Sequence, residues 1–348
     1  KMANFKGQNE RSVQDIVYFL QHREGKWRGR ETGHNEARKP LFLFINLMET
    51  HLPFWPPGRF VEQVAPYLRT DREARDILRR WNREAYRWAA PLAEPLGELE
   101  EQVLADLYDA EVAYQDDYLG QFFETLAARA NRDHTLTVIV GDHGDGHGEH
   151  GVFGHGFVAY QELVQVPLIV HWPHRVPAGG RIPAPVSARR VYHTILEAAG
   201  PLPDPTGLPD LRGLSLREVA HGRDVEQGTA YSEIYPPLNF VKAIQSRQPE
   251  LVERFGCTLL RRAIVKDRLK LIQVDGRPAE LYDLSSDPAE RVNLVHERPL
   301  EAAGLSNQLD RFVGVQEMQR DNLAAGAALD LEADEKLLQH LRGLGYIE

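Results

Sequence analysis

The chain of 348 residues is long enough for one large domain with a smaller appendage. Its 42% hydrophobic and 26% charged residues are ordinary for a globular protein and exclude collagen-like, fully disordered and membrane-spanning classes. A formal net charge of -10 disfavours sequence-independent binding to nucleic acid, which needs a basic surface, so we expect no nucleic-acid partner.

Other general features of the chain bear on its compartment. The longest apolar runs are too short to cross a bilayer, so we expect no membrane span. No signal peptide is visible, but the chain opens on Lys1 and Met2, and we therefore expect the natural N-terminus to lie upstream. The single cysteine excludes a disulfide framework within the chain, which slightly favours the cytoplasm. The sequence indicates no oligomeric state.

Three short, continuously apolar segments predict strands that are buried on both faces, at residues 41–47, 136–140 and 166–170. Between the first two, apolar residues recur mostly at spacings of three, four and seven from Val103 to Leu126, which predicts a long helix. The order strand, helix, strand indicates an α/β domain over residues 1–220, in which we expect a mainly parallel sheet flanked by helices.

The rest of the chain predicts an insertion and a second subdomain. Residues 62–98 predict an inserted helical excursion, and a cluster of proline, aspartate and glycine marks a break at residues 201–209. The C-terminal subdomain is expected to span residues 221–348 and to contain a small antiparallel sheet followed by helices. Its predicted strands are 229–235, 262–266, 269–273 and 280–284, its predicted turns 267–268 and 275–276, and its predicted helices 300–313 and 335–344.

Titratable side chains follow two of the predicted strands, where an α/β sheet binds its ligands. Residues 46–54 read NLMETHLPF and residues 142–156 read DHGDGHGEHGVFGHG. Asp142 and His143 lie between two glycines, which let the backbone turn sharply. A carboxylate and an imidazole from adjacent residues can bind one cation but supply only part of its shell. An ordinary turn would also favour these residue types.

The ordered combination of these segments resembles the sulfatase family of the alkaline phosphatase superfamily. Residues 142–156, followed by 160–162 and 166–170, are similar to that family, and residues 46–54 resemble its motif of an Asn followed by His-x-Pro-Phe or Tyr. Residues 280–294, which read ELYDLSSDPAERVNL, resemble its C-terminal signature, and the LRGLGY of residues 341–346 is common there too. The resemblance therefore runs from about Asn46 to the end of the chain.

The resemblance implies an alkaline-phosphatase-like fold and a sulfuric ester hydrolase that uses one divalent cation, Ca²⁺ or alternatively Mg²⁺ or Mn²⁺. Asp142 and His143 match two metal ligands of the family. His51 matches the histidine that contacts the sulfate and helps the departing oxygen, and His155 occupies the position of a lysine or histidine that lies against the sulfate. The implied substrate is a small-molecule or saccharide sulfate ester.

The chain departs from the family pattern at the nucleophile. Family members carry paired aspartates and then Cys-x-Pro-x-Arg, or Ser for Cys, whose first residue becomes formylglycine, and neither motif occurs here. Cys257 lacks the proline, so we expect it to be a small buried residue. Formylglycine is therefore expected only in a segment outside these residues. We expect the chain alone to be poorly stable or inactive, because apolar faces and strand edges would stay uncovered.

Two alternatives to a sulfatase stay open. One is a phosphodiesterase or phosphonate hydrolase of the same superfamily, because sulfate and phosphate esters share a tetrahedral geometry. The other is a non-catalytic, sulfatase-like remnant that binds sulfated or phosphorylated ligands. Residues 142–156 form a glycine-rich loop, and its weaker site candidates are Asp145, His147, Glu149 and His150.

Overall fold

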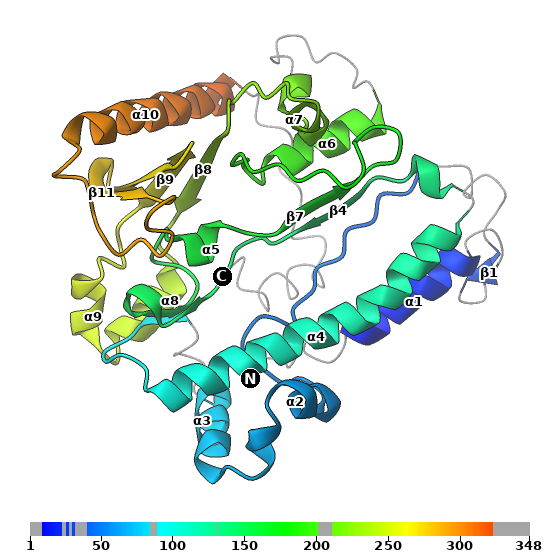
Figure 1. The fold of residues 1–348 in the computed structure, drawn as a ribbon, viewed down its shortest axis with the longest axis horizontal. Coiled ribbons are helices and arrows are strands. Elements are labelled where there is room, and N and C mark those ends of the chain that lie inside the picture. The colour runs from blue at the N-terminus through cyan, green and yellow to red at the C-terminus, as the bar shows by residue number, and fades with distance from the viewer. Residues whose placement is uncertain are drawn as a thin grey trace.

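A long helix organises one half of the molecule. The computed structural model describes residues 9–22, 26–27, 30–31, 40–83, 89–129, 131–200 and 211–322. Helix α4 (Glu98–Ala128) runs across the molecule with α1 (Asn9–His22) packed alongside it (Figure 1). Helices α2 (Gly58–Val64) and α3 (Arg72–Arg83) pack against another part of α4.

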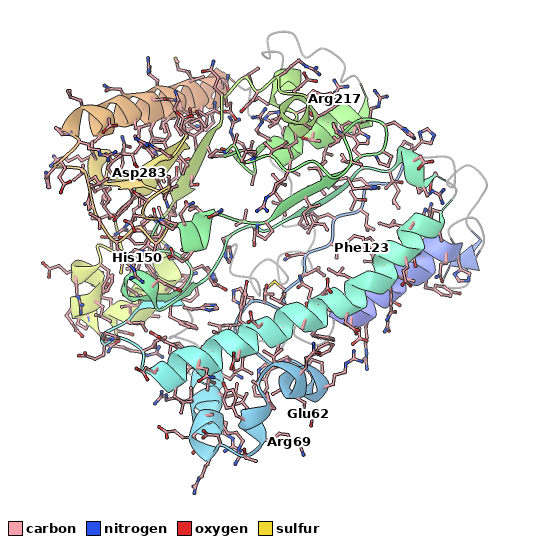
Figure 2. The ribbon with its side chains drawn as sticks, in the orientation of Figure 1. Glu62, Arg69, Phe123, His150, Arg217 and Asp283 are labelled. Carbon is pink, nitrogen blue, oxygen red and sulfur yellow. The ribbon has the colours of Figure 1, made fainter. Side chains whose placement is uncertain are left out.

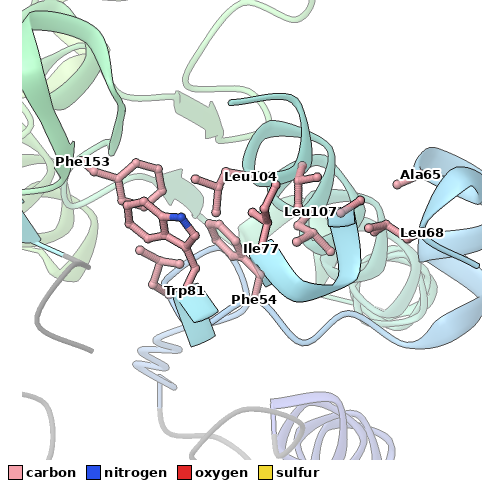
Figure 3. Close-up of a cluster of buried hydrophobic side chains, with 11 residues drawn as sticks. Phe54, Ala65, Leu68, Ile77, Trp81, Leu104, Leu107 and Phe153 are labelled. Carbon is pink, nitrogen blue, oxygen red and sulfur yellow. The ribbon is translucent and has the colours of Figure 1, made fainter. Parts of the chain in front are cut away.

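The predicted helix between the first two apolar segments is confirmed by α4, which extends beyond both of its expected ends. Three glutamates in its first turn interact favourably with the positive end of the helix dipole. Its apolar face packs with Trp81 of α3 and with Phe54 and Phe153 in one buried cluster (Figure 3). The ring centroids of Trp81 and Phe153 lie 4.4 Å apart, so this core joins α3 to the glycine-rich loop.

The predicted inserted excursion contains α2, the 3-10 helix η1 (Pro66–Arg69), α3 and a short strand, β3 (Ala89–Pro91). Strand β3 pairs with β6 (Val152–Gly154), which pairs with β5 (Gly146–His147), in a three-stranded antiparallel sheet. A hairpin from the glycine-rich loop is thereby attached to the excursion.

The predicted mainly parallel sheet is not found among the described residues, where all strand pairs are antiparallel. Two of its expected strands form, as β4 (Thr137–Val140) and β7 (Leu168–His171), and they pair with each other. The prediction of a strand at residues 41–47 was wrong: the segment has no strand pairing and leaves 78% of Phe44 exposed. Continuous hydrophobicity indicates a segment that needs covering, but it specifies no hydrogen-bonding partner.

The predicted small antiparallel sheet is confirmed. Its strand order is β11-β10-β9-β8, from strands β8 (Thr229–Ile234), β9 (Arg261–Lys266), β10 (Leu269–Val274) and β11 (Arg277–Asp283). Both predicted two-residue turns form, and Asp267 and Asp275 adopt positive φ angles of 53° and 47° there. Helix α10 (Pro299–Asn322) covers one face through Leu305 and Leu309, which confirms the predicted helix at 300–313 (Figure 1).

Shorter elements complete the described chain. They are β1 (Lys26–Trp27), β2 (Arg30–Glu31), η3 (Arg132–His134), η4 (Glu149–Gly151), α5 (Gln161–Val164), α6 (Arg190–Ala199), η5 (Leu211–Leu214), α7 (Leu216–Ala220), α8 (Leu238–Gln245) and α9 (Pro249–Arg254). The predicted break at 201–209 and helix at 335–344 lie outside the described residues. Among the helices that the structure describes, none is long and apolar enough to span a membrane.

Candidate functional site

Asp142 and His143, directly after β4, line a cavity of about 1810 Å³ together with His155. Gly141 N donates to Pro167 O at 3.1 Å, and Gly144 N donates to Leu163 O at 2.8 Å. The two residues between these bonds are therefore held on both sides. The Asp142 carboxylate accepts from His143 N at 3.0 Å, and its side chain is 69% exposed.

His51 reaches the same place from a different part of the chain. Its neighbours Leu52 and Phe54 are buried in the core against α3 and α4. Asn82 of α3 fixes the Phe54 backbone with two hydrogen bonds, accepting from Phe54 N at 3.1 Å and donating to Phe54 O at 2.7 Å. This anchoring sets the ring centroid of His51 at 5.0 Å from that of His155.

His155 lies at the centre of the cluster. It follows β6, which folds back over the glycine-rich loop and brings its ring centroid to 4.1 Å from that of His143. Its Nδ1 donates to Asp145 Oδ1 at 2.9 Å. The Asp145 side chain is only 11% exposed, so this bond is shielded from water.

The three imidazoles share one tautomer. Each Nδ1 faces an oxygen that can only accept, so each must carry the proton. The acceptors are Leu52 O for His51 at 2.6 Å, Gly144 O for His143 at 2.9 Å and Asp145 Oδ1 for His155. A backbone carbonyl or carboxylate in this role fixes the ring and leaves Nε2 to bind a metal ion or, when it is protonated, to donate to a ligand oxygen.

Burial shifts the pKa values of two groups, one in the cluster and one beside it. The pKa of His51 is lowered, mainly because its charged form is desolvated, while the hydrogen bond to Leu52 opposes the shift. The pKa of Tyr108 is raised, first by burial and then by the nearby Asp145 carboxylate. His51 is therefore neutral over more of the physiological range than a free histidine.

The donor atoms fit a divalent cation. Ligand atoms of His143, Asp145 and His155 all lie within 4.8 Å of one another, and Asp142 Oδ2 is 3.8 Å from His143 Nε2. Carboxylate and imidazole donors of this kind bind divalent ions, although these side chains supply only part of a Ca²⁺ shell. The structure thus brings Asp142, His143, His51 and His155 together and adds Asp145.

The other weak candidates do not join the cluster. His147 packs its ring against Phe153 and Tyr108, and Glu149 accepts from His147 N at 2.5 Å. His150 lies on the side of the molecule that carries the C-terminal sheet (Figure 2). Its ring stacks on that of Tyr160, with ring centroids 3.6 Å apart. Among the four weaker candidates the sequence did not distinguish Asp145, since its contact with His155 depends on the β5–β6 hairpin.

Cys257 is fully buried, as expected, and packs with Val152 and Leu251 away from the cluster. Its Sγ lies 3.7 Å from Leu251 O, and burial raises the pKa of the thiol. A buried thiol with a raised pKa is a poor nucleophile.

Comparisons with known proteins identify the family of the chain. The profile described as Sulfatase matches residues 28–201, and the one described as N-sulphoglucosamine sulphohydrolase, C-terminal, matches residues 148–313. The chain belongs to the sulfatase family. This membership places it in the alkaline phosphatase superfamily and confirms the resemblance in the motifs.

Two curated sulfatases illustrate how far the similarity extends. The uncharacterized sulfatase YidJ of Escherichia coli is 26% identical over 262 residues, which are 74% of this chain and 48% of that protein. The choline-sulfatase of Rhizobium meliloti is 26% identical over 301 residues, which are 82% of this chain and 52% of that protein. The chain thus spans about half the length of these sulfatases.

Solved structures support the fold. A protein named as a sulfatase, yidJ from Bacteroides fragilis, superposes with a TM-score of 0.60 at 19% identity, over 88% of this chain and 58% of that one. The phosphonate monoester hydrolase of Agrobacterium radiobacter gives a TM-score of 0.51 at 23% identity, over 63% of this chain and 42% of that one. The chain therefore has an α/β sulfatase-like fold.

Proposed function

We propose that the intact protein hydrolyses a sulfate ester in a metal-assisted reaction at the cluster of His51, His143 and His155. Asp142 and His143 bind the cation, which offsets negative charge on the sulfate oxygens when it is present. Ca²⁺ is the proposed ion, and Mg²⁺ and Mn²⁺ also accept a shell of carboxylate oxygens. Members of the family are typically metal-dependent.

The observation that carries the proposal is the close grouping of three imidazoles that share one tautomer. Their Nδ1 protons are all committed to acceptors within the protein, and the ring centroids of His51 and His143 lie 5.0 and 4.1 Å from that of His155. The Nε2 atoms are thus left for ligands: that of His143 for the cation, and those of His51 and His155 for an anionic group. In this proposal the protonated Nε2 of His155 contacts a sulfate oxygen, and His51 donates a proton to the departing oxygen. The lowered pKa of His51 makes its protonated form a stronger acid.

The substrate is proposed to be a small-molecule or saccharide sulfate ester. One solved structure of similar fold is Ps i-CgsB in complex with k-i-k-neocarrahexaose, with a TM-score of 0.51 and 16% identity to this chain. That complex shows that the same fold can hold a carbohydrate chain.

The second candidate is a phosphonate monoester hydrolase. It is favoured by the similarity of fold to the Agrobacterium radiobacter enzyme. The site chemistry is compatible with both, because sulfate and phosphonate monoesters present oxygens in a similar tetrahedral arrangement to the same imidazoles and cation.

The test compares 4-nitrophenyl sulfate with 4-nitrophenyl phenylphosphonate as substrates of the intact protein. We expect the larger kcat/KM with the sulfate ester, loss of that activity with a chelator, and recovery with Ca²⁺. His155→Ala should lower kcat/KM for the sulfate ester by about 100-fold or more, as expected for loss of a group that stabilises the transition state. A larger kcat/KM with the phosphonate would assign the second function, and no turnover of either would favour the non-catalytic remnant.

A further inference from the structure

A cluster of charged residues lies where α5 meets the C-terminal sheet. It contains His150, Glu162, Lys270 and Glu290. Lys270 of β10 and Glu290, in the segment after β11, have side chains with 0% exposure and form an ion pair of 2.7 Å. His150 Nε2 lies 3.7 Å from Glu162 Oε1.

The cluster already contains its own cation. Ligand atoms of His150, Glu162 and Glu290 lie within 4.8 Å of one another, as a metal site would require. The Lys270 ammonium, however, lies on Glu290 and supplies the positive charge there. A metal ion would have to displace this buried ammonium, so the structure favours a role in holding elements together over a role in binding metal.

Such a pair is not explained by stability alone. Burial lowers the pKa of Lys270 and raises that of Glu290, which shows that both charged forms are desolvated. Apolar residues of similar volume are often as stable in place of a buried ion pair, whereas removal of one partner is strongly destabilising. A fixed geometry is what the charged pair supplies and apolar residues do not.

Both members of this ion pair form hydrogen bonds with the first residue of α5. Glu290 Oε2 accepts from Gln161 N at 2.5 Å, and Lys270 Nζ donates to Gln161 Oε1 at 3.1 Å. Both the backbone and the side chain of Gln161 are therefore bound by the C-terminal subdomain. Because α5 spans only Gln161–Val164, fixing its first residue fixes the whole element.

From α5 the contact continues to the site. Leu163 O accepts from Gly144 N at 2.8 Å, and Gly144 O accepts from His143 Nδ1 at 2.9 Å. The backbones are so close that a Cβ on Gly144 would lie 1.9 Å from Glu162 O. A displacement of α5 would therefore move the residue that orients the His143 ring.

We propose that Lys270 and Glu290 are positioning residues, which hold α5 and through it the orientation of His143. The inference rests on the proposed function only in treating His143 as a metal ligand. It assigns to the C-terminal sheet a role in the geometry of a histidine cluster to which the sheet contributes no residue.

The test measures hydrogen–deuterium exchange of the 141–147 peptide, which contains the Gly144 amide. The variant is Lys270→Met combined with Glu290→Met, which removes both charges and leaves neither buried without a partner. We expect this peptide to exchange about tenfold faster or more, at a thermal midpoint near that of the wild type. The α4 peptides should be unchanged.

A matched control removes another buried ion pair. Arg190 is fully buried and pairs with Asp224 at 2.6 Å, and none of its hydrogen bonds reaches α5. Arg190→Met with Asp224→Asn should leave exchange of the 141–147 peptide unchanged. An equal effect of both double variants on that peptide, or no effect of the Lys270 variant, would overturn the inference.

Two further measurements keep the test decisive. If the double variant does not fold, Gln161→Ala removes the acceptor for Lys270, together with an exposed hydrogen bond to Gln165, and leaves both charges in place. It should also accelerate exchange of the 141–147 peptide; unchanged exchange would overturn the inference. In the intact protein the Lys270 variant should raise the Ca²⁺ concentration for half-saturation about tenfold, within the range found when groups that orient a metal ligand are removed. Faster exchange in a protein that binds no cation would support the positioning role and contradict the proposed function.

Discussion

At the scale of single residues, the site depends on acceptors that each take one proton from an imidazole. Two of these acceptors are backbone carbonyls, and mutation cannot remove them. The third, Asp145, is a side chain and is the only one of the three that substitution can delete. Its contribution is therefore directly measurable.

We predict that Asp145→Ala lowers kcat/KM for a sulfate ester about 10- to 100-fold, because His155 loses the acceptor that fixes its tautomer and ring angle. Asp133→Ala is a suitable control, since Asp133 lines the same cavity but is exposed beside Arg132. Steady-state kinetics of both variants would settle the matter. Equal activities for the Asp145 variant and the wild type would show that His155 needs no such partner.

The His51 ring provides a pH-dependent prediction. Its pKa in the folded chain lies below 6.5, so between that value and 6.5 the unfolded chain binds more protons than the folded one. The stability that the neutral ring contributes is complete above pH 6.5 and declines as the pH falls through this window. An NMR titration of metal-free protein should find His51 titrating below 6.5, whereas a value at or above 6.5 would contradict the burial of the ring.

At the scale of elements, the site is built where three short elements meet, since the end of β4, the β5–β6 hairpin and α5 are joined by Gly144. The close approach to Glu162 O leaves no space for a side chain at this position. This makes Gly144 a structural requirement of the loop rather than a flexible spacer.

We predict that Gly144→Ala destabilises the chain by about 1–3 kcal/mol or more, because the β4 loop and α5 must move apart. Gly120 is the matched control: it lies on the exposed face of α4, and a Cβ there would meet nothing within 4 Å. Gly120→Ala should stabilise by about 0.5–1 kcal/mol through reduced chain entropy. Denaturant unfolding measures both, and an unaffected Gly144 variant would contradict the close contact.

The elements differ in how well the sequence predicts them. Helix α4 and the β9–β10–β11 meander depend on local periodicity and on two-residue turns at Asp267 and Asp275, so they were predictable. The failed strand at 41–47 depends on a partner elsewhere in the chain. The direction of the β4–β7 pairing is equally non-local, because it depends on how residues 141–167 return the chain. Hydrophobicity alone contains neither piece of information.

At the scale of the whole molecule, an apolar surface stays uncovered beside the site. The paired residues Ile139 of β4 and Ile169 of β7 are 37% and 57% exposed. Phe42 and Phe44, in the apolar segment 41–47, are also exposed. Exposed sheet faces of this kind promote association between molecules. This supports the expectation that the chain alone is poorly stable.

We therefore predict that the 348-residue chain self-associates and that Ile169→Lys increases its monomer fraction, because a charge on this face resists burial. Val225→Lys places the same charge on another exposed apolar residue and should have little effect. Sedimentation velocity at several concentrations distinguishes the two. A chain that is monomeric without either substitution would contradict the prediction.

The candidate site was predictable as a set of residues but not as an arrangement. The motifs at 46–54 and 142–156 identified Asp142, His143, His51 and His155, and the structure brings these four together. Asp145 was predicted only as a weaker candidate. Its contact with His155 and the contact of α5 with Lys270 and Glu290 could not be foreseen, because they depend on a hairpin and on a sheet that lie far apart in the sequence.

The most direct test of the account is calorimetric titration of the intact protein and of its Asp142→Ala and His143→Ala variants with Ca²⁺. We expect one equivalent of Ca²⁺ to bind the intact protein and the affinity to fall about tenfold or more in each variant, since each loses a proposed ligand. Unchanged Ca²⁺ affinity in both variants, with Mg²⁺ and Mn²⁺ behaving alike, would show that the cluster at the end of β4 is not a metal site.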